Sequence, residues 1–80
     1  MKDFENRIKV INTYLSNNTS SQQLQKYIIE IETLIKENTS YHFAFFVLAI
    51  AYWKILNLEK AIFNFKKCLE IDPDFELGKS

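Results

Sequence analysis

The feature that most limits the fold of this chain is a run of eleven consecutive apolar residues, from Phe43 to Trp53. As a helix, this run would have no polar face over three turns, so neighbouring segments would have to cover it on nearly all sides. Lys54 ends the run, which is therefore shorter than the roughly 20 residues that a membrane-spanning helix requires. We expect the central helix of a small domain here, and we do not expect a membrane as a partner.

The rest of the chain also favours helices. Only one Gly and one Pro occur in 80 residues, both near the C-terminus, so most of the sequence lacks the residues that punctuate sheets and tight turns. Apolar residues recur at steps of three and four at about residues 3–16, 21–37 and 58–70. Asp3 precedes Arg7 by four residues, a spacing that favours an ion pair within the first helix. The sequence therefore predicts an all-α fold of four antiparallel helices.

Short polar residues and one proline mark the ends of these helices. Ser20 and Gln23 have the spacing of a capping box at the start of the second helix. The segment 38–40 is expected to end that helix and to cap the third, and Pro73 is expected to end the fourth just after Asp72. The buried face of the fourth helix is expected to consist of Ala61, Ile62, Phe65, Cys68 and Leu69.

The second half of the chain resembles one tetratricopeptide repeat, whose pattern is W-x2-L-G-x2-Y, then A-x3-F, then P, over about 34 residues. The resemblance covers residues 42–75 and implies a pair of packed antiparallel helices. Such repeats bind other proteins and carry no chemistry of their own. A scaffold or a chaperone-like adaptor, with another protein or a peptide as its partner, is therefore implied. The matching residues are Phe45-x2-Leu48-Ala49-x2-Tyr52, then Ala61-x3-Phe65, then Pro73, with Phe in place of Trp and Ala in place of Gly.

The first half follows the same period less closely. Stepping back 34 residues, the repeat length of the family, places Leu48 on Tyr14 and Ala61 on Tyr27. Small residues let two helices approach closely, so a Tyr in place of an Ala predicts a wider or tilted pair. We interpret residues 1–38 as a divergent repeat or a capping hairpin.

This organisation predicts a single helical-repeat domain over residues 1–80. It consists of the divergent hairpin at 1–38, the tetratricopeptide repeat at 41–75 and a short tail at 76–80, stacked as part of an α-α superhelix. About three stacked repeats are usually needed for stability, and this chain has two at most. Two expectations follow: the chain self-associates through its uncovered apolar surface, or it is a piece of a longer repeat array.

In the proteins that this chain resembles, the first helix of each repeat lines a concave groove. The matching, partner-binding positions here are Phe43, Phe46, Ile50, Trp53 and Lys54. Burying one large apolar side chain is worth about 1.5–3 kcal/mol, so four of them left in water would forgo a large part of a small domain's stability. One explanation is that the first helix covers them as ordinary core. The other is a hydrophobic groove for a partner helix or peptide, or a seam between two copies.

A groove that holds a partner's terminal carboxylate is not expected. Repeat domains of that kind place Lys and Asn where this chain has Phe46, Val47 and Ile50. On the first helix, the matching positions could hydrogen-bond a peptide backbone, although an ordinary solvated face is the favoured explanation. These positions are Lys9, Asn12, Thr13 and Ser16.

Composition excludes several other functions. The ten basic and ten acidic residues are divided equally between the two halves of the chain, so no basic surface for nucleic acid is expected. A single Cys cannot form an internal disulfide, and residues 1–5 do not resemble a signal peptide, so we expect a cytoplasmic protein. Cys68 and His42 are the sharpest catalytic pair, but Cys68 lies on the expected buried face, where a thiol is not activated. We expect no enzyme, no cofactor and no metal site.

Overall fold

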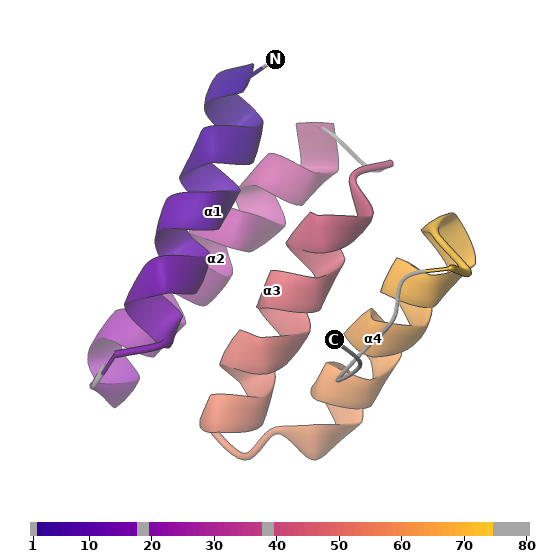
Figure 1. Ribbon diagram of the computed structural model, residues 1–80. Coiled ribbons are helices and arrows are strands. Elements are labelled where there is room, and N and C mark those ends of the chain that lie inside the picture. Colours follow the sequence, from indigo (N-terminus) through magenta and orange to yellow (C-terminus); the bar gives the residue numbers. More distant parts are fainter. Residues whose placement is uncertain (1, 18–19, 38–39, 75–80) are drawn as a thin grey trace.

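The computed structural model describes residues 2–17, 20–37 and 40–74, and within these residues it contains four α-helices and no strand. Consecutive helices run antiparallel, and α3 lies between the α1/α2 pair and α4 (Figure 1). The predicted all-α fold of two stacked helical hairpins is confirmed. The helices are α1 (Lys2–Leu15), α2 (Ser21–Glu37), α3 (His42–Lys54) and α4 (Leu58–Ile71).

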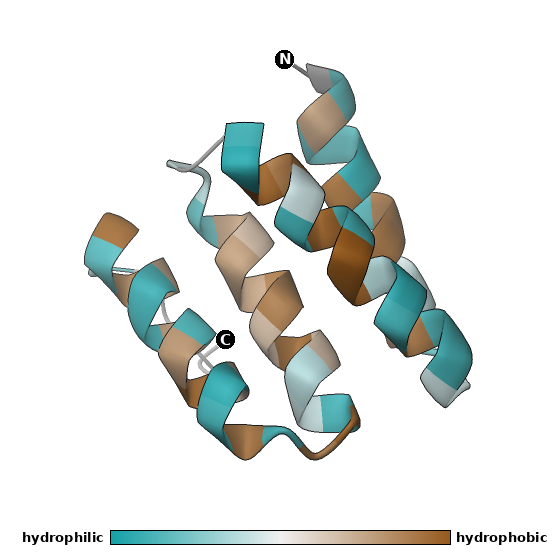
Figure 2. Cartoon of the chain, turned by 180° about the vertical axis from the view of Figure 1, so that it is seen from behind, coloured by the Kyte–Doolittle hydropathy of each residue, from teal (hydrophilic) through white to brown (hydrophobic). Residues whose placement is uncertain are grey.

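Helix α3 is the central element, as its apolar sequence predicts. It packs against each of the other three helices, and its contact with α4 is the most extensive in the molecule. Figure 2 colours α3 brown to white over most of its length, whereas the other helices alternate brown with teal. Since α3 supplies the middle of the core, its neighbours need only one apolar stripe each. The fully buried side chains include Ile8, Ile11 and Leu15 of α1, Ile31 of α2, Val47 of α3 and Cys68 of α4.

The turn between α3 and α4 is a three-residue connection, Ile55 to Asn57, built on a Schellman motif. The Leu56 N–H donates to the carbonyl of Trp53 at 2.9 Å, and the Asn57 N–H donates to the carbonyl of Tyr52 at 2.9 Å. This motif requires a left-handed residue, and Leu56 supplies it with a φ of 66°. Asn57 then caps α4, because its side-chain Oδ1 accepts from the Lys60 N–H at 3.4 Å.

Two helix ends agree with the sequence and one does not. The Gln23 N–H donates to the Ser20 hydroxyl at 3.3 Å, so Ser20 caps α2 as its spacing predicts. Helix α4 ends before Asp72 and Pro73, as expected. The expectation that the segment 38–40 caps α3 is wrong for Ser40, because the N-cap is Tyr41, whose side chain makes no capping hydrogen bond. Residues 38–39 and the expected tail at 76–80 lie outside the described residues.

The buried face of α4 is rotated relative to the expected one. Ala61 and Cys68 are buried and Phe65 is partly buried, as expected, but Ile62 and Leu69 are exposed. Asn64 is buried in their place. The expected face was too wide because it included every apolar residue, whereas α4 packs mainly against the single neighbour α3. An apolar side of α4, carrying Ile62 and Leu69, is thus left open.

The first hairpin is held together differently from the second. Tyr14 of α1 and Tyr27 of α2 stack with ring centroids 5.7 Å apart, and α1 and α2 make far fewer contacts than α3 and α4. This agrees with the expectation of a wider pair. The sequence predicted an ion pair between Arg7 and Asp3 within α1, and this prediction is wrong. Arg7 pairs instead with Glu30 of α2. In the described parts of the chain, no helix is long and apolar enough to cross a bilayer.

Candidate protein-binding surface

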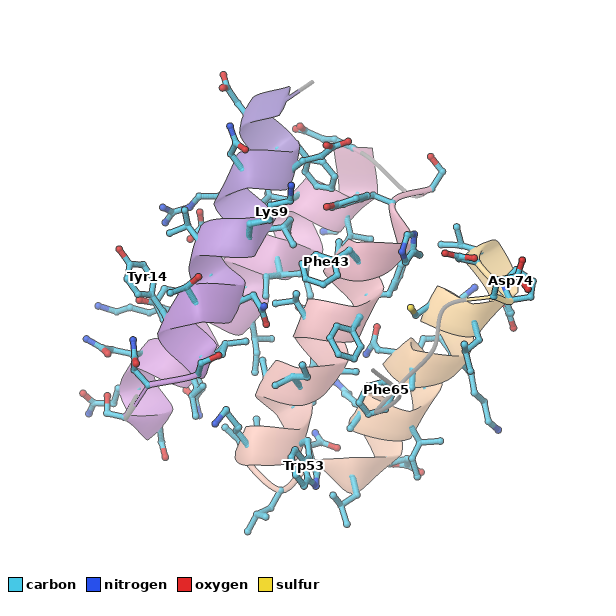
Figure 3. The ribbon with its side chains drawn as sticks, in the orientation of Figure 1. Lys9, Tyr14, Phe43, Trp53, Phe65 and Asp74 are labelled. Atoms are coloured by element: carbon cyan, nitrogen blue, oxygen red, sulfur yellow. The ribbon has the colours of Figure 1, made fainter. Side chains whose placement is uncertain are left out.

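The five positions expected to bind a partner lie on the side of α3 that faces away from its buried residues. Phe43, Phe46, Ile50 and Trp53 recur at steps of three and four, and Lys54 follows directly; we call these five residues the α3 surface. Ala44, Val47, Leu48 and Ala51 are fully or almost fully buried on the other side of the helix. In Figure 3, Phe43 and Trp53 mark the two ends of this surface, and Phe65 of α4 lies beside it.

The α3 surface is not uniformly open. Trp53 is 59% exposed and Lys54 is exposed, whereas Phe43, Phe46 and Ile50 are partly buried and pack against the core. The expectation that these residues are ordinary core is therefore met in part by Phe43, Phe46 and Ile50, whereas Trp53 and Lys54 stay open. The N-terminal part is largely covered within this chain, and the open apolar area is concentrated around Trp53.

Aromatic side chains connect the partly buried end of this surface to both flanking helices. The ring of Phe43 lies 5.7 Å from that of Phe46, and the ring of Phe46 lies 5.9 Å from that of Phe65. On the other side, Tyr41 contacts Phe43 at 6.2 Å and Phe4 at 5.3 Å, both edge-to-face. Contacts of this kind hold the rings in place, so this part of the surface is already ordered without a partner.

The sequence missed the part of this surface that α4 contributes. Leu58, Ile62, Phe65 and Leu69 share one side of α4 at helical spacing, and Phe65 joins this side to Phe46 of the α3 surface. Leu58 and Ile62 are more than half exposed. We call these four residues the α4 flank. The sequence placed Ile62, Phe65 and Leu69 on the buried face of this helix and did not name Leu58, because apolar periodicity does not separate core residues from surface ones.

Two of the polar positions named on the first helix, Thr13 and Ser16, are hydrogen-bonded to the backbone of the preceding turn. The Thr13 hydroxyl donates to the carbonyl of Lys9 at 3.1 Å, and the Ser16 hydroxyl donates to the carbonyl of Asn12 at 3.2 Å. Back-bonding of this kind is common for Ser and Thr in helices. The explanation of Lys9, Asn12, Thr13 and Ser16 as an ordinary helix face therefore suffices.

The structure places Cys68 and His42 in separate roles. Cys68 is fully buried, and burial, followed by the negative charge of Asp72, raises the pKa of its thiol. His42 Nε2 lies 3.5 Å from Asp72 Oδ2, which ties the start of α3 to the end of α4. A buried thiol with a raised pKa has little thiolate and is a poor nucleophile. Within the described residues, no three His, Cys, Asp or Glu side chains are grouped as a metal ion would require.

A second candidate site, which the sequence did not indicate, is a pocket of about 410 Å³ where α2, α3 and α4 meet. The Tyr52 hydroxyl donates to the Glu32 carboxylate, and burial together with this hydrogen bond raises the pKa of Tyr52 to about 12. Lys60 Nζ lies 5.5 Å from the centre of the Tyr52 ring. The pocket is lined by Glu32, Tyr52, Glu59, Lys60, Phe63 and Asn64.

Two antiparallel helical hairpins that share a core through α3 define a helical-repeat protein. Residues 42–75 match the family model named Tetratricopeptide repeat. This match and the four-helix fold support a repeat protein of the tetratricopeptide type, as the spacing of its second half predicts. Comparison with curated proteins and with solved structures gave no match. The repeat indicates a protein–protein interaction module.

Proposed function

We propose that the protein binds an apolar helix or extended peptide of another protein across the α3 surface and the α4 flank. The observation that supports this most directly is Trp53, which is 59% exposed although it is the last of the eleven apolar residues that begin at Phe43. Large aromatic side chains dominate the energy of protein interfaces when they enter a partner's pocket. Contiguous exposed apolar surface on a folded domain often marks an interaction site.

The chemistry of this surface sets what kind of partner fits it. Trp53, Leu58 and Ile62 are apolar, and Lys54 is the one charged residue of the α3 surface and the α4 flank. The chain as a whole has no net charge. Binding should therefore depend on burying apolar area, and the affinity should change little between low and high salt. An amphipathic helix that presents apolar residues at helical spacing is the best-matched partner.

Self-association is the second candidate function, supported by the same exposed residues. Two copies could cover each other's Trp53, Leu58 and Ile62 in a symmetric contact. In that case the surface would serve assembly, and no peptide would bind. The two functions predict different oligomeric states for the purified chain. Light scattering after size-exclusion chromatography distinguishes a monomer from a dimer.

The test compares Trp53→Ala with a control that removes an equally exposed apolar side chain elsewhere. Ile29 of α2 is 64% exposed and lies outside both surfaces, so Ile29→Ala is the matched control. Proteins bound by the tagged wild type are identified first. Each partner's binding segment is then synthesised and titrated against the three chains, whose helicity is verified by circular dichroism.

We expect Trp53→Ala to weaken peptide binding about thirtyfold, the effect of a 2 kcal/mol hot-spot residue, and Ile29→Ala to leave it unchanged. Equal affinities for the wild type and Trp53→Ala would contradict the proposal. A dimer that Trp53→Ala dissociates, together with no bound peptide, would assign the surface to self-association instead.

We also propose a cytoplasmic location. The one cysteine of the sequence is buried as a free thiol, and the fold uses no disulfide that an oxidising compartment would have to form.

A further inference from the structure

The pocket between α2, α3 and α4 has a chemistry unlike that of the apolar surface proposed for partner binding. None of its six lining residues belongs to the α3 surface or the α4 flank. Glu32 comes from the first hairpin, and Tyr52, Glu59 and Phe63 come from the second. Its volume of about 410 Å³ is within the range of small-ligand sites, which starts near 300 Å³. Helix α2 forms one of its walls and lies behind α1 in Figure 1.

Asn64 is the residue that points to a ligand. Its side chain lines the pocket although the residue is only 6% exposed, and its Nδ2 donates to the carbonyl of Lys60 at 2.8 Å. That hydrogen bond fixes the amide, so the Oδ1 is the atom left to accept. No donor to this oxygen is found among the described residues. Every side-chain nitrogen or oxygen of these residues that is completely buried has a hydrogen-bond partner, so the unpaired Oδ1 is not completely buried. The Oδ1 is therefore accessible to solvent, and because Asn64 lines the pocket, this oxygen is available to accept from a donor bound there.

The other polar groups of the pocket also favour a donor, and a positively charged one. The carboxylates of Glu32 and Glu59 outnumber the single ammonium of Lys60. The Tyr52 hydroxyl already donates to Glu32, so it is not available as a donor to a ligand. The ammonium of Lys60 itself lies over the Tyr52 ring, 5.5 Å from its centre, which shows that a cation is accommodated at this wall.

The aromatic ring of Phe63 in the pocket wall favours a planar cation. Phe63 is mostly exposed, and one face of its ring is approached by Lys67, whose Nζ lies 5.8 Å from the ring centre. Because Phe63 lines the pocket and its side chain is mostly exposed, its ring offers aromatic surface on which a flat cation can stack. A guanidinium stacks on aromatic rings, carries five N–H donors in one plane and is less strongly hydrated than an ammonium. We propose that this pocket binds the arginine side chain of a partner protein, with Glu59 and Glu32 as counter-charges and Asn64 Oδ1 as an acceptor.

The probe that tests this site is N-acetyl-arginine amide, followed by ¹H–¹⁵N correlation spectra of the full chain. We expect saturable shifts of the Asn64 side-chain amide and of the backbone amides near Glu59 and Phe63. A single side chain should bind with a midpoint in the millimolar range, about −4 kcal/mol at 1 mM. N-acetyl-citrulline amide has the same shape without the charge, and we expect it to bind at least about threefold more weakly.

Two variants and a matched control separate the pocket from general surface charge. Glu59→Gln should weaken the arginine probe about threefold, whereas Glu70→Gln, on the same helix but outside the pocket, should not. Lys60→Met removes the ammonium that lines the pocket and should strengthen binding of the arginine probe. Equal binding of the arginine and citrulline probes, or equal effects of Glu59→Gln and Glu70→Gln, would overturn the proposal. So would the absence of saturable shifts in the wild type. None of these results depends on Trp53 or on the apolar surface.

Discussion

At the scale of single residues, Leu56 shows how the second hairpin is closed. It is the one residue of the described parts, glycine aside, whose φ is positive, at 66°. A left-handed conformation places the Cβ of an ordinary residue too close to its own backbone and costs about 1–2 kcal/mol. The Leu56 side chain is 80% exposed, so burial does not offset this cost. The Schellman motif that ends α3 requires the conformation regardless of which residue occupies the position.

Leu56→Gly should therefore stabilise the protein. Gly adopts a positive φ without strain, although it also increases the entropy of the unfolded chain, so the free energy of unfolding should rise by about 0.5–1 kcal/mol. Urea denaturation followed by circular dichroism measures this change. Leu56→Ala is the control, because it removes the exposed side chain but keeps the Cβ. A gain in Leu56→Ala as large as in Leu56→Gly would show that the backbone of residue 56 is not strained.

At the scale of helices, the ion pair between α1 and α2 has a definite pH dependence. The guanidinium of Arg7, which hydrogen-bonds Glu30, lowers the pKa of the Glu30 carboxyl below its ordinary value. A carboxyl whose pKa is lower in the folded state stabilises the fold above its unfolded pKa. That stability is lost as the pH falls through the folded pKa. Both side chains are partly exposed, so solvent screens the pair and its contribution is at most about 1 kcal/mol.

Glu30→Gln should therefore destabilise the protein at pH 7 by about 0.5–1 kcal/mol, and this loss should disappear as the pH falls through the lowered pKa of Glu30 and the wild-type carboxylate becomes protonated. Urea denaturation at a series of pH values gives the difference. Asp3→Asn is the control, since the sequence alone paired Asp3 with Arg7. If Asp3→Asn shows the pH-dependent loss and Glu30→Gln does not, Arg7 pairs within α1 after all.

The contrast between these two partners of Arg7 shows what the sequence can predict. Periodicity identifies a helix and its apolar stripe, and Ile8 and Ile11 are fully buried as their spacing implies. It does not reveal which neighbour each face meets. Glu30 therefore could not be assigned to Arg7, and Ile62 was expected in the core although it is exposed. These errors concern contacts between helices, whereas the existence of all four helices was predicted.

The same limit applies to the candidate sites. The α3 surface could be proposed from the sequence, because its residues lie on one helix at helical spacing and match groove positions of one family, but the sequence did not show that Phe43, Phe46 and Ile50 are partly buried. The pocket could not, because Glu32 lies twenty residues before Tyr52 and meets it only when the second helix of one hairpin packs on the next hairpin. The role of Asn64 could not be predicted either, since a lone Asn on a helix is ordinarily a surface residue.

At the scale of the whole molecule, the two hairpins are unequal. Helices α3 and α4 approach closely because small side chains, Ala49 and Ala61, are buried in the second hairpin. Helices α1 and α2 instead carry the stacked pair Tyr14 and Tyr27, and they contact each other least of all neighbouring pairs. The first hairpin is therefore held mainly by the contacts of α1 and α2 with α3.

Native-state hydrogen exchange should reveal this inequality. Local opening requires fewer lost contacts where a helix has fewer neighbours, so amides of α1 should exchange with a free energy at least about 1 kcal/mol below those of α3. Helix α3 should be the most protected, because every other helix covers part of it. Exchange of individual amides, measured by NMR, gives these free energies.

A variant tests whether the difference comes from the sparse contact between α1 and α2. Arg7→Gln removes the ion pair that joins α1 to α2, so it should lower protection in α1 and leave α4 unchanged. A uniform decrease over all four helices would mean that the chain opens only as one unit. In that case the closely packed repeat would have no stability of its own, and the first hairpin would be as essential to the interaction surface as α3 itself.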